Sequence, residues 1–139
     1  MKCFYHNDMD GRCAGSIVAM FENNYNKEDY FEVDYMMDLT PMLEKIQDGE
    51  KVYFVDYSFK ENTKYILHNL IEKDCDVIWI DHHASSLELE KHHNWNIKGL
   101  RQDKISGAAL TYMYLYNLGF DEIPYYIKLV SDYDCWIYN

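Results

Sequence analysis

Short runs of apolar residues alternate along this 139-residue chain with segments of helical periodicity. Two of the runs, Val52–Val55 and Val77–Ile80, consist only of β-branched and aromatic residues. Strands of this kind are buried on both faces, as in a parallel sheet that is covered by helices on both sides. We therefore predict an α/β fold, a three-layer sandwich with a mainly parallel central sheet flanked by helices.

The periodicity and the capping residues place the expected elements along the chain. Strands are predicted at Lys2–Tyr5, Tyr30–Asp34, Val52–Val55 and Val77–Ile80. Helices are predicted at Gly11–Tyr25, from Thr40 as N-cap, after a capping box at Ser58–Glu61, from Ser106 to Leu118, and from Asp121. The polar segment 84–104 is predicted to be mostly loop with a further short strand.

The charge balance limits the partners of the chain. There are 24 Asp and Glu residues against 13 Lys and Arg, a formal charge of −11. Such a surface repels phosphate backbones and anionic lipid, so we expect neither long duplex DNA nor a membrane as a partner. The four cysteines are scattered without a C-x-x-C pair, which is typical of free thiols in a reducing compartment, and we expect a cytoplasmic protein.

Carboxylates follow three of the predicted strands, and the carboxyl ends of parallel strands meet at one edge of a sheet. These residues are Asp8 and Asp10, Asp56, and the triplet Asp81-His82-His83. An Asp after a strand is frequently only the N-cap of the next helix, but capping does not explain two histidines after Asp81. Two carboxylates 4 Å apart repel by about 4 kcal/mol at an effective dielectric constant near 20, so divalent cations are expected to hold such a cluster together. The imidazoles favour Mn²⁺, Fe²⁺, Co²⁺ or Zn²⁺ over Mg²⁺ or Ca²⁺.

Four motifs in this order resemble those of the DHH phosphoesterase superfamily, over a region from about Phe4 to Trp136. They are Asp8-x-Asp10-Gly11, Val55-Asp56, Asp81-His82-His83 and Ser131-Asp132. The resemblance implies a hydrolase with two divalent metal ions, Mn²⁺ first and Mg²⁺, Co²⁺ or Fe²⁺ as alternatives. It implies hydrolysis of phosphodiester bonds in short oligonucleotides or cyclic dinucleotides by a metal-activated water, with longer single strands and pyrophosphate left open as substrates.

The resemblance also implies roles for individual residues. The metal ligands would be His6, Asp8, Asp10, Asp56, His82 and Asp132, with Asp56 shared by both ions. The catalytic residues would be Asp81 and His83, and the substrate contacts would be His83, Arg12 and Arg101.

His6 lies two residues before Asp8, whereas many family members place this histidine four residues before the aspartate. Asp134 is the alternative to Asp132, since residues two apart on a helix point in different directions, and we expect His92 and His93 to lie on the surface.

Two other functions remain as alternatives. One is a non-catalytic module that binds metal and nucleotide. The other is an aspartyl-phosphate phosphatase of the haloacid dehalogenase type, although that pattern needs Thr or Val where this chain has Arg12. Members of the superfamily usually continue into a smaller C-terminal domain, so we expect residues 1–139 to be a single catalytic domain, either a minimal form or part of a longer protein. A monomer and a homodimer are both left open.

Overall fold

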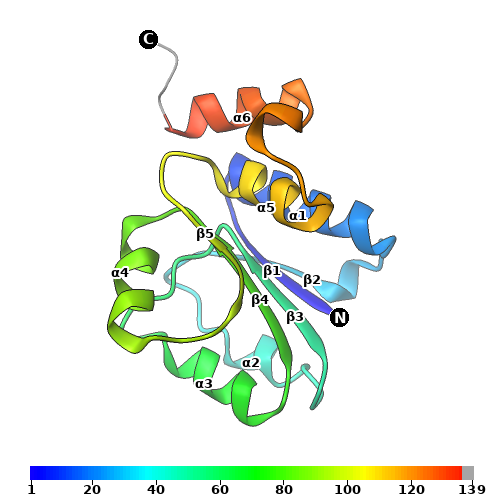
Figure 1. Cartoon of the computed structure of the whole chain (residues 1–139). Helices are drawn as coiled ribbons and strands as arrows, with labels where there is room; N and C mark the ends of the chain where they lie inside the picture. Colours follow the sequence, from blue (N-terminus) through cyan, green and yellow to red (C-terminus); the bar gives the residue numbers. More distant parts are fainter. Residues whose placement is uncertain (136–139) are drawn as a thin grey trace.

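The computed structural model describes residues 1–135, and in it five parallel strands form one sheet in the order β2-β1-β3-β4-β5 (Figure 1). The strands are β1 (Lys2–His6), β2 (Tyr30–Val33), β3 (Lys51–Val55), β4 (Asp76–Asp81) and β5 (Lys98–Arg101). The predicted α/β sandwich with a parallel sheet is therefore confirmed. The chain proceeds outward in opposite directions from β1 and β3, so these neighbouring strands form the switch point at which open α/β sheets bind ligands.

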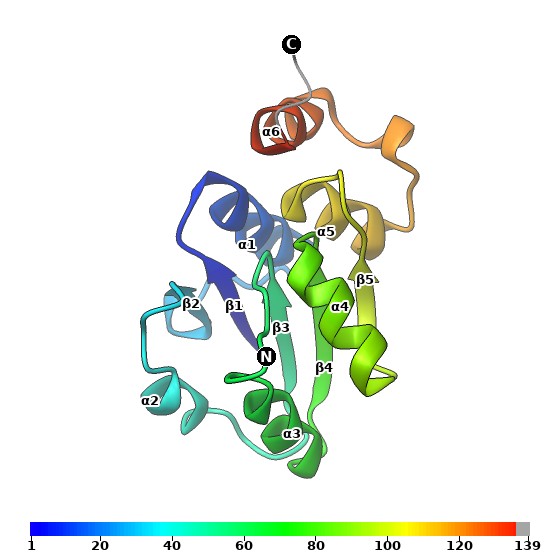
Figure 2. The ribbon, with the colours of Figure 1, turned by 90° about the vertical axis from the view of Figure 1, so that its left-hand side faces the viewer.

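Helices cover both faces of the sheet (Figure 2). On one face lie α1 (Met9–Glu22) and α5 (Gly107–Tyr116), and α6 (Tyr125–Cys135) packs on the far side of these two helices (Figure 1). On the other face lie α2 (Thr40–Leu43), α3 (Tyr65–Glu72) and α4 (Ala84–His93). Short 3-10 turns occur at Lys27–Asp29 and Phe120–Glu122. None of the described helices is long and apolar enough to cross a membrane.

The two central strands are buried on both sides, as their sequences predict. In β3, Val52 and Phe54 contribute to the core beneath α2, α3 and α4, whereas Tyr53 and Val55 contribute to the core beneath α1 and α5. Because successive side chains of a strand point to opposite faces, both faces must be apolar when both are covered.

The segment 84–104 was expected to be mostly loop with a further short strand; the strand is confirmed, whereas the loop prediction was wrong. It contains α4, which is followed by Asn94 in the left-handed conformation, and β5 at the edge of the sheet. Only Ser86 and Leu89 of α4 are buried. A helix that buries so narrow a stripe leaves almost no apolar periodicity in its sequence.

Two predicted helix starts were also wrong. The capping box at Ser58 and Glu61 does not form, because α3 begins at Tyr65 and Ser58 is buried with its hydroxyl bonded to other serines. Thr40 is the first residue of α2 rather than its N-cap, and its N–H is bonded instead to the Asp38 carboxylate, 3.0 Å away.

The remaining boundaries differ by a few residues. Helix α1 begins at Met9 because Asp8 caps it, and α6 begins at Tyr125, after the turn that contains Asp121. Ser106 caps α5 as predicted by accepting a hydrogen bond from the Ala109 N–H, although α5 ends at Tyr116.

Candidate metal centre at the carboxyl edge of the sheet

The register of the central strands brings the acidic residues together. Tyr5 of β1 pairs with Val55 of β3, and Val55 pairs with Ile80 of β4. The residues that follow these three positions therefore leave the sheet at the same edge. The carboxylates that meet there are those of Asp8, Asp10, Asp56 and Asp81.

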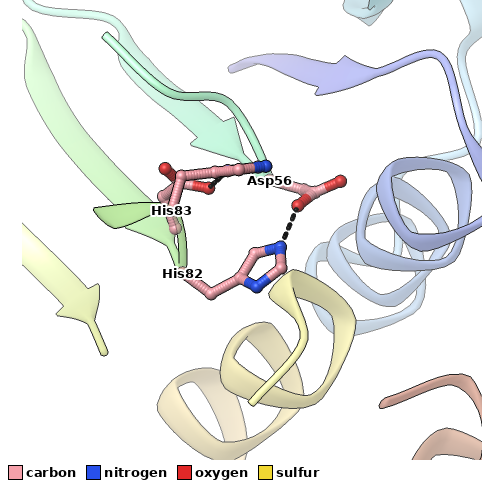
Figure 3. Close-up of side chains that lie close together, drawn as sticks. Asp56, His82 and His83 are labelled. Atoms are coloured by element: carbon pink, nitrogen blue, oxygen red, sulfur yellow. Dashed lines mark hydrogen bonds and ion pairs between the residues drawn. The ribbon is translucent and has the colours of Figure 1, made fainter. Parts of the chain in front are cut away.

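Asp56 has an unusual environment. Its backbone is left-handed, with φ of 54°, and its side chain is buried. Neither carboxylate oxygen accepts a hydrogen bond of normal geometry within residues 1–135, although His82 Nε2 lies 3.2 Å from Oδ1 (Figure 3). A buried carboxylate without donors is costly, so this position is suited to a positively charged ligand.

His6 and Asp8 form a first group of potential ligands with Asp56. The ligand atoms of the three residues lie within 4.8 Å of one another, and His6 Nδ1 is 2.9 Å from Asp8 Oδ2. In the described part of the chain, the buried side-chain N and O atoms without a hydrogen bond are His6 Nδ1 and the two oxygens of Asp56. All of them belong to this one group, as expected of atoms that are placed to hold a metal ion.

A second group surrounds His82. Its Nε2 atom lies 3.5 Å from Asp10 Oδ2, 3.2 Å from Asp56 Oδ1 and 3.4 Å from Asp134 Oδ2. Asp56 is thus common to both groups. A carboxylate shared in this way can bridge two ions in a binuclear centre.

Asp10 is oriented by the first turn of α5. Its oxygens accept hydrogen bonds from the backbone N–H groups of Gly107, at 2.8 Å, and Ala108, at 2.7 Å. A helix N-terminus stabilises negative charge. Gly107 also allows α5 to pack closely on Asp56, since a Cβ atom at Gly107 would lie 2.6 Å from the Cβ of Asp56. Gly11 has a similar role in α1, since a Cβ atom would lie 2.0 Å from the carbonyl oxygen of His6.

The crowding of carboxylates changes their protonation. Burial, with the charges of Asp10 and Asp8, raises the pKa of Asp56 to about 12 and that of Asp134 to about 6. Burial lowers the pKa of His82 despite its acidic neighbours. Neutral imidazole is the form that binds a metal ion, and added cations would allow the carboxylates to ionise.

Asp8 is the exception among these carboxylates, because its pKa is lowered. Burial opposes ionisation, but the hydrogen bond from the Gly11 N–H and the neighbouring His6 outweigh it. The hydrogen bond from the Gly11 N–H to the Asp8 carboxylate measures 2.8 Å, and through it Asp8 also serves as the N-cap of α1.

Asp81 and His83 lie beside the second group, since potential ligand atoms of Asp56, Asp81, His82 and His83 are all within 4.8 Å of one another, and Asp81 also holds His83. His83 Nδ1 lies 2.7 Å from Asp81 Oδ1, and this hydrogen bond raises the pKa of His83. The other oxygen of Asp81 accepts a hydrogen bond from the Ser86 hydroxyl, which also contacts the hydroxyl of Ser58. Asp81 and both serines are buried, so the network fixes the orientation of the His83 ring.

The structure brings Asp134, rather than the preferred Asp132, to the centre. Asp134 contacts His82, whereas within residues 1–135 Asp132 makes no ion pair or hydrogen bond with either ligand group. The two positions differ by about 200° around the helix axis. Trp136, the last residue of the expected motif region, lies outside the described residues.

The side chains of the expected substrate contacts Arg12 and Arg101 are engaged by other groups. The Arg12 guanidinium pairs with Glu32 on an exposed surface. Arg101 uses all its donors internally, on Glu90 and on the carbonyl oxygens of Trp79, Ile97 and Lys98. His92 and His93 are at the end of α4 and do not join the ligand groups, as expected.

Two residues of this region, Ser86 and Cys135, belong to no motif in the sequence, whereas Gly107 follows the helix cap Ser106. Ser86 and Gly107 support the acidic residues from other elements, and Cys135 has its thiol within 4.8 Å of potential ligand atoms of His82 and Asp134. Their contacts depend on how α4, α5 and α6 pack. The Ser106-Gly107 pair at a helix start is the signal that could have suggested a carboxylate close to the first N–H groups of that helix.

The fold and the site together define a doubly wound α/β protein with a cluster of carboxylates and histidines at its switch point. This chain belongs to the DHH family, because the model of the family's N-terminal domain matches residues 3–133.

A curated relative is oligoribonuclease NrnB of Bacillus subtilis, which is 26% identical over 150 residues. The alignment covers 96% of this chain and 36% of NrnB, so the chain spans about a third of that protein's length. A crystal structure of an uncharacterised protein from Helicobacter pylori G27 has a TM-score of 0.67 at 16% identity, covering 98% of this chain and 43% of that one. This second likeness supports the fold.

Proposed function

We propose that this protein is a divalent-metal-dependent phosphoesterase that hydrolyses phosphodiester bonds in short oligonucleotides. The observation that carries the proposal is Asp56, a buried carboxylate without hydrogen-bond donors that belongs to both ligand groups. The name of the relative NrnB supports an oligoribonucleotide substrate. The net charge of −11 favours a short substrate over a long duplex.

The residues fit two divalent ions. His6, Asp8 and Asp56 would hold one ion, and Asp10, Asp56, His82 and Asp134 would hold the other. When bound, such ions polarise phosphoryl oxygens and lower the pKa of a coordinated water toward neutrality. The mixed carboxylate and imidazole ligands favour Mn²⁺, with Mg²⁺, Co²⁺ and Fe²⁺ as alternatives.

His83 is the group that handles the proton of the leaving oxygen. Asp81 accepts the Nδ1–H of His83, which leaves Nε2 free for the substrate, and 38% of the His83 side chain is exposed. The hydrogen bond to Asp81 raises the pKa of His83 and so favours the protonated imidazole, the form in which Nε2 can donate a proton to the leaving oxygen. The N–H groups of α5 hold the Asp10 carboxylate in place beside His82.

We also propose a cytoplasmic location, because all four cysteines are free thiols and lie at scattered positions. The aspartyl-phosphate alternative loses its support, because membership of the DHH family already accounts for the pair of Asp8 and Asp10.

The direct test is hydrolysis of the dinucleotide pApA with Mn²⁺, followed by chromatography of the products. Asp56→Ala is expected to lower kcat/KM by at least about 100-fold, and Asp81→Ala by about 10- to 100-fold. A Mn²⁺-loaded parent protein that cleaves no phosphate ester disproves the proposal. Tight binding of pApA without any product would identify the non-catalytic module instead.

The pair Asp134 and Asp132 gives a matched control for the ligand assignment. Asp134→Asn is expected to weaken binding of one Mn²⁺ ion by at least about tenfold, measured by calorimetry. Asp132→Asn is expected to bind Mn²⁺ as the parent does. The reverse result would assign the ligand to Asp132.

A further inference from the structure

Two loops beside the metal centre meet at Tyr35. The loop 34–39 follows β2 and the loop 56–64 follows β3, so both leave the carboxyl edge of the sheet. The backbone N–H of Ser58 donates to the Tyr35 hydroxyl at 3.2 Å, and the ring centroids of Tyr35 and Tyr57 are 5.3 Å apart. The Tyr35 ring also lies 5.0 Å from the imidazole of His6. Tyr35 therefore connects the loop 56–64 to a residue of the first ligand group.

Lys60 lies over this ring. Its Nζ atom is 4.8 Å from the centroid of Tyr35, within the range of cation–π contacts. Lys60 is exposed, and within residues 1–135 its ammonium forms no ion pair with a carboxylate. By contrast, Lys64 in the same loop pairs with Glu61 at 2.6 Å, and Arg12 pairs with Glu32.

A cation without an acidic partner is unexpected at this place. The chain carries a net charge of −11, and carboxylates gather at the same edge of the sheet. An ammonium held there by an aromatic ring remains able to bind an anion from solution. The Tyr35 ring limits the positions that the long side chain can adopt, which lowers the entropic cost of binding.

We propose that Lys60, held by Tyr35, binds the phosphate group of the substrate that neighbours the cleaved one. This inference rests on the proposed function. The Lys60 ammonium and the His6 imidazole lie 4.8 Å and 5.0 Å from the centre of the same tyrosine ring, so a substrate held at His6 extends its neighbouring phosphate toward Lys60. The adjoining Met36 is 94% exposed and offers apolar surface to the neighbouring base.

A pair of substrates that differ by one phosphate tests the inference. The kcat/KM values for pApA and for ApA, which lacks the 5′-phosphate, are measured for the parent and for Lys60→Met, Lys60→Arg and Lys64→Met. The parent is expected to prefer pApA. Lys60→Met is expected to lose about tenfold on pApA, through KM, with no change on ApA. Lys60→Arg should retain most of the preference, and Lys64→Met all of it.

The result separates the two proposals. The assignment of Lys60 is overturned if the parent shows no preference for pApA. It is also overturned if Lys60→Met leaves kcat/KM unchanged on both substrates, or lowers it by the same factor on both. If the Mn²⁺-loaded parent cleaves neither dinucleotide, the proposed function fails and binding decides the role of Lys60. In that case the Kd values for pApA and ApA are measured by calorimetry. The assignment is supported if the parent binds pApA more tightly than ApA and Lys60→Met removes this difference. It is overturned if the difference persists in the variant, or if the parent shows no difference.

Discussion

At the scale of single residues, a chain of hydroxyl groups decides how His83 is held. Each serine has one hydroxyl proton, and Ser86 donates its proton to Asp81. Ser58 must then donate to Ser86, and Ser85 to Ser58, so the three hydroxyls form an ordered chain that ends on the carboxylate. Such a chain strengthens each of its bonds.

We expect Ser86→Ala to lower kcat on pApA by about tenfold, because Asp81 loses a buried donor and the His83 ring loses its fixed orientation. The free energy of unfolding should fall by about 1–3 kcal/mol in urea titrations. Ser85→Ala is the control, because Ser85 is exposed and lies at the start of the chain of hydroxyls. A Ser86→Ala variant with the activity of the parent would show that the network does not position His83.

The sequence was informative about single residues where a motif lies directly after a strand. Asp56 and the Asp81-His82-His83 triplet were placed at the sheet edge because β3 and β4 are recognisable strands. The choice between Asp132 and Asp134 depends on the rotation of α6 about its axis. That rotation is set by packing against α1 and α5, which a local pattern does not encode.

At the scale of elements, the start of α5 shows how closely helix and strand must approach. Gly→Ala inside a helix ordinarily stabilises by about 1 kcal/mol. At Gly107 we expect the substitution to lower the free energy of unfolding instead, because the new Cβ would lie 2.7 Å from Asp56 Oδ1. Gly107→Ala should destabilise the protein by about 1–3 kcal/mol in urea titrations and weaken Mn²⁺ binding.

Gly119→Ala is the control. A Cβ atom at Gly119 would meet only a flexible Glu122 oxygen, 3.3 Å away, so the free energy of unfolding should stay within about 0.5 kcal/mol of that of the parent. Stabilisation by Gly107→Ala would contradict the close approach.

The end of α1 is tied to β3 by a half-buried carboxylate, that of Glu22. Glu22 accepts hydrogen bonds from Lys51, at 2.9 Å, and from the Tyr53 hydroxyl. Burial opposes ionisation, but these two bonds outweigh it and lower the pKa of Glu22 from its ordinary value of 4.5. Because the folded pKa is the lower one, the stabilisation is present above pH 4.5 and is lost as the pH falls through the folded pKa.

Glu22→Gln should therefore reduce the free energy of unfolding by about 1 kcal/mol near pH 7, and by less at about pH 3.5. Urea titrations at both pH values provide the measurement, with the exposed Glu72→Gln as a control that should show no difference at either pH. A Glu22→Gln effect that grows as the pH falls would have the wrong sign for this interaction.

Elements were predictable from the sequence where burial on two faces or a strong cap left a clear pattern. Strands β3 and β4 and the cap of α5 at Ser106 belong to this class. Helix α4 does not, because its sequence is mostly polar and its contact with the sheet is narrow. The capping box at Ser58 failed for a tertiary reason, since the Ser58 hydroxyl is used by the network of Asp81.

At the scale of the whole molecule, the sheet edge gathers negative charge in a protein that is already acidic. Without cations, this arrangement destabilises the fold, since Asp56 and its neighbours cannot all be ionised. Binding of metal ions to the folded state alone would remove that cost and make the stability depend on metal concentration.

This linkage predicts that Asp56→Asn has opposite effects on the Tm in the absence and in the presence of metal ions. Each Mn²⁺ site that is filled at 100 times its Kd should stabilise the parent by about 2.7 kcal/mol, which raises the Tm by about 10 °C per site. Asp56→Asn keeps the shape but has no carboxyl group that must take up a proton on folding, so the metal-free variant should melt at or above the Tm of the metal-free parent. Mn²⁺ should shift the Tm of this variant by less than half as much as that of the parent. Calorimetric melting of both proteins in EDTA and in Mn²⁺ makes the comparison. Equal shifts in the two proteins would mean that Asp56 holds no metal ion, because a ligand shared by both sites cannot be neutralised without loss of affinity.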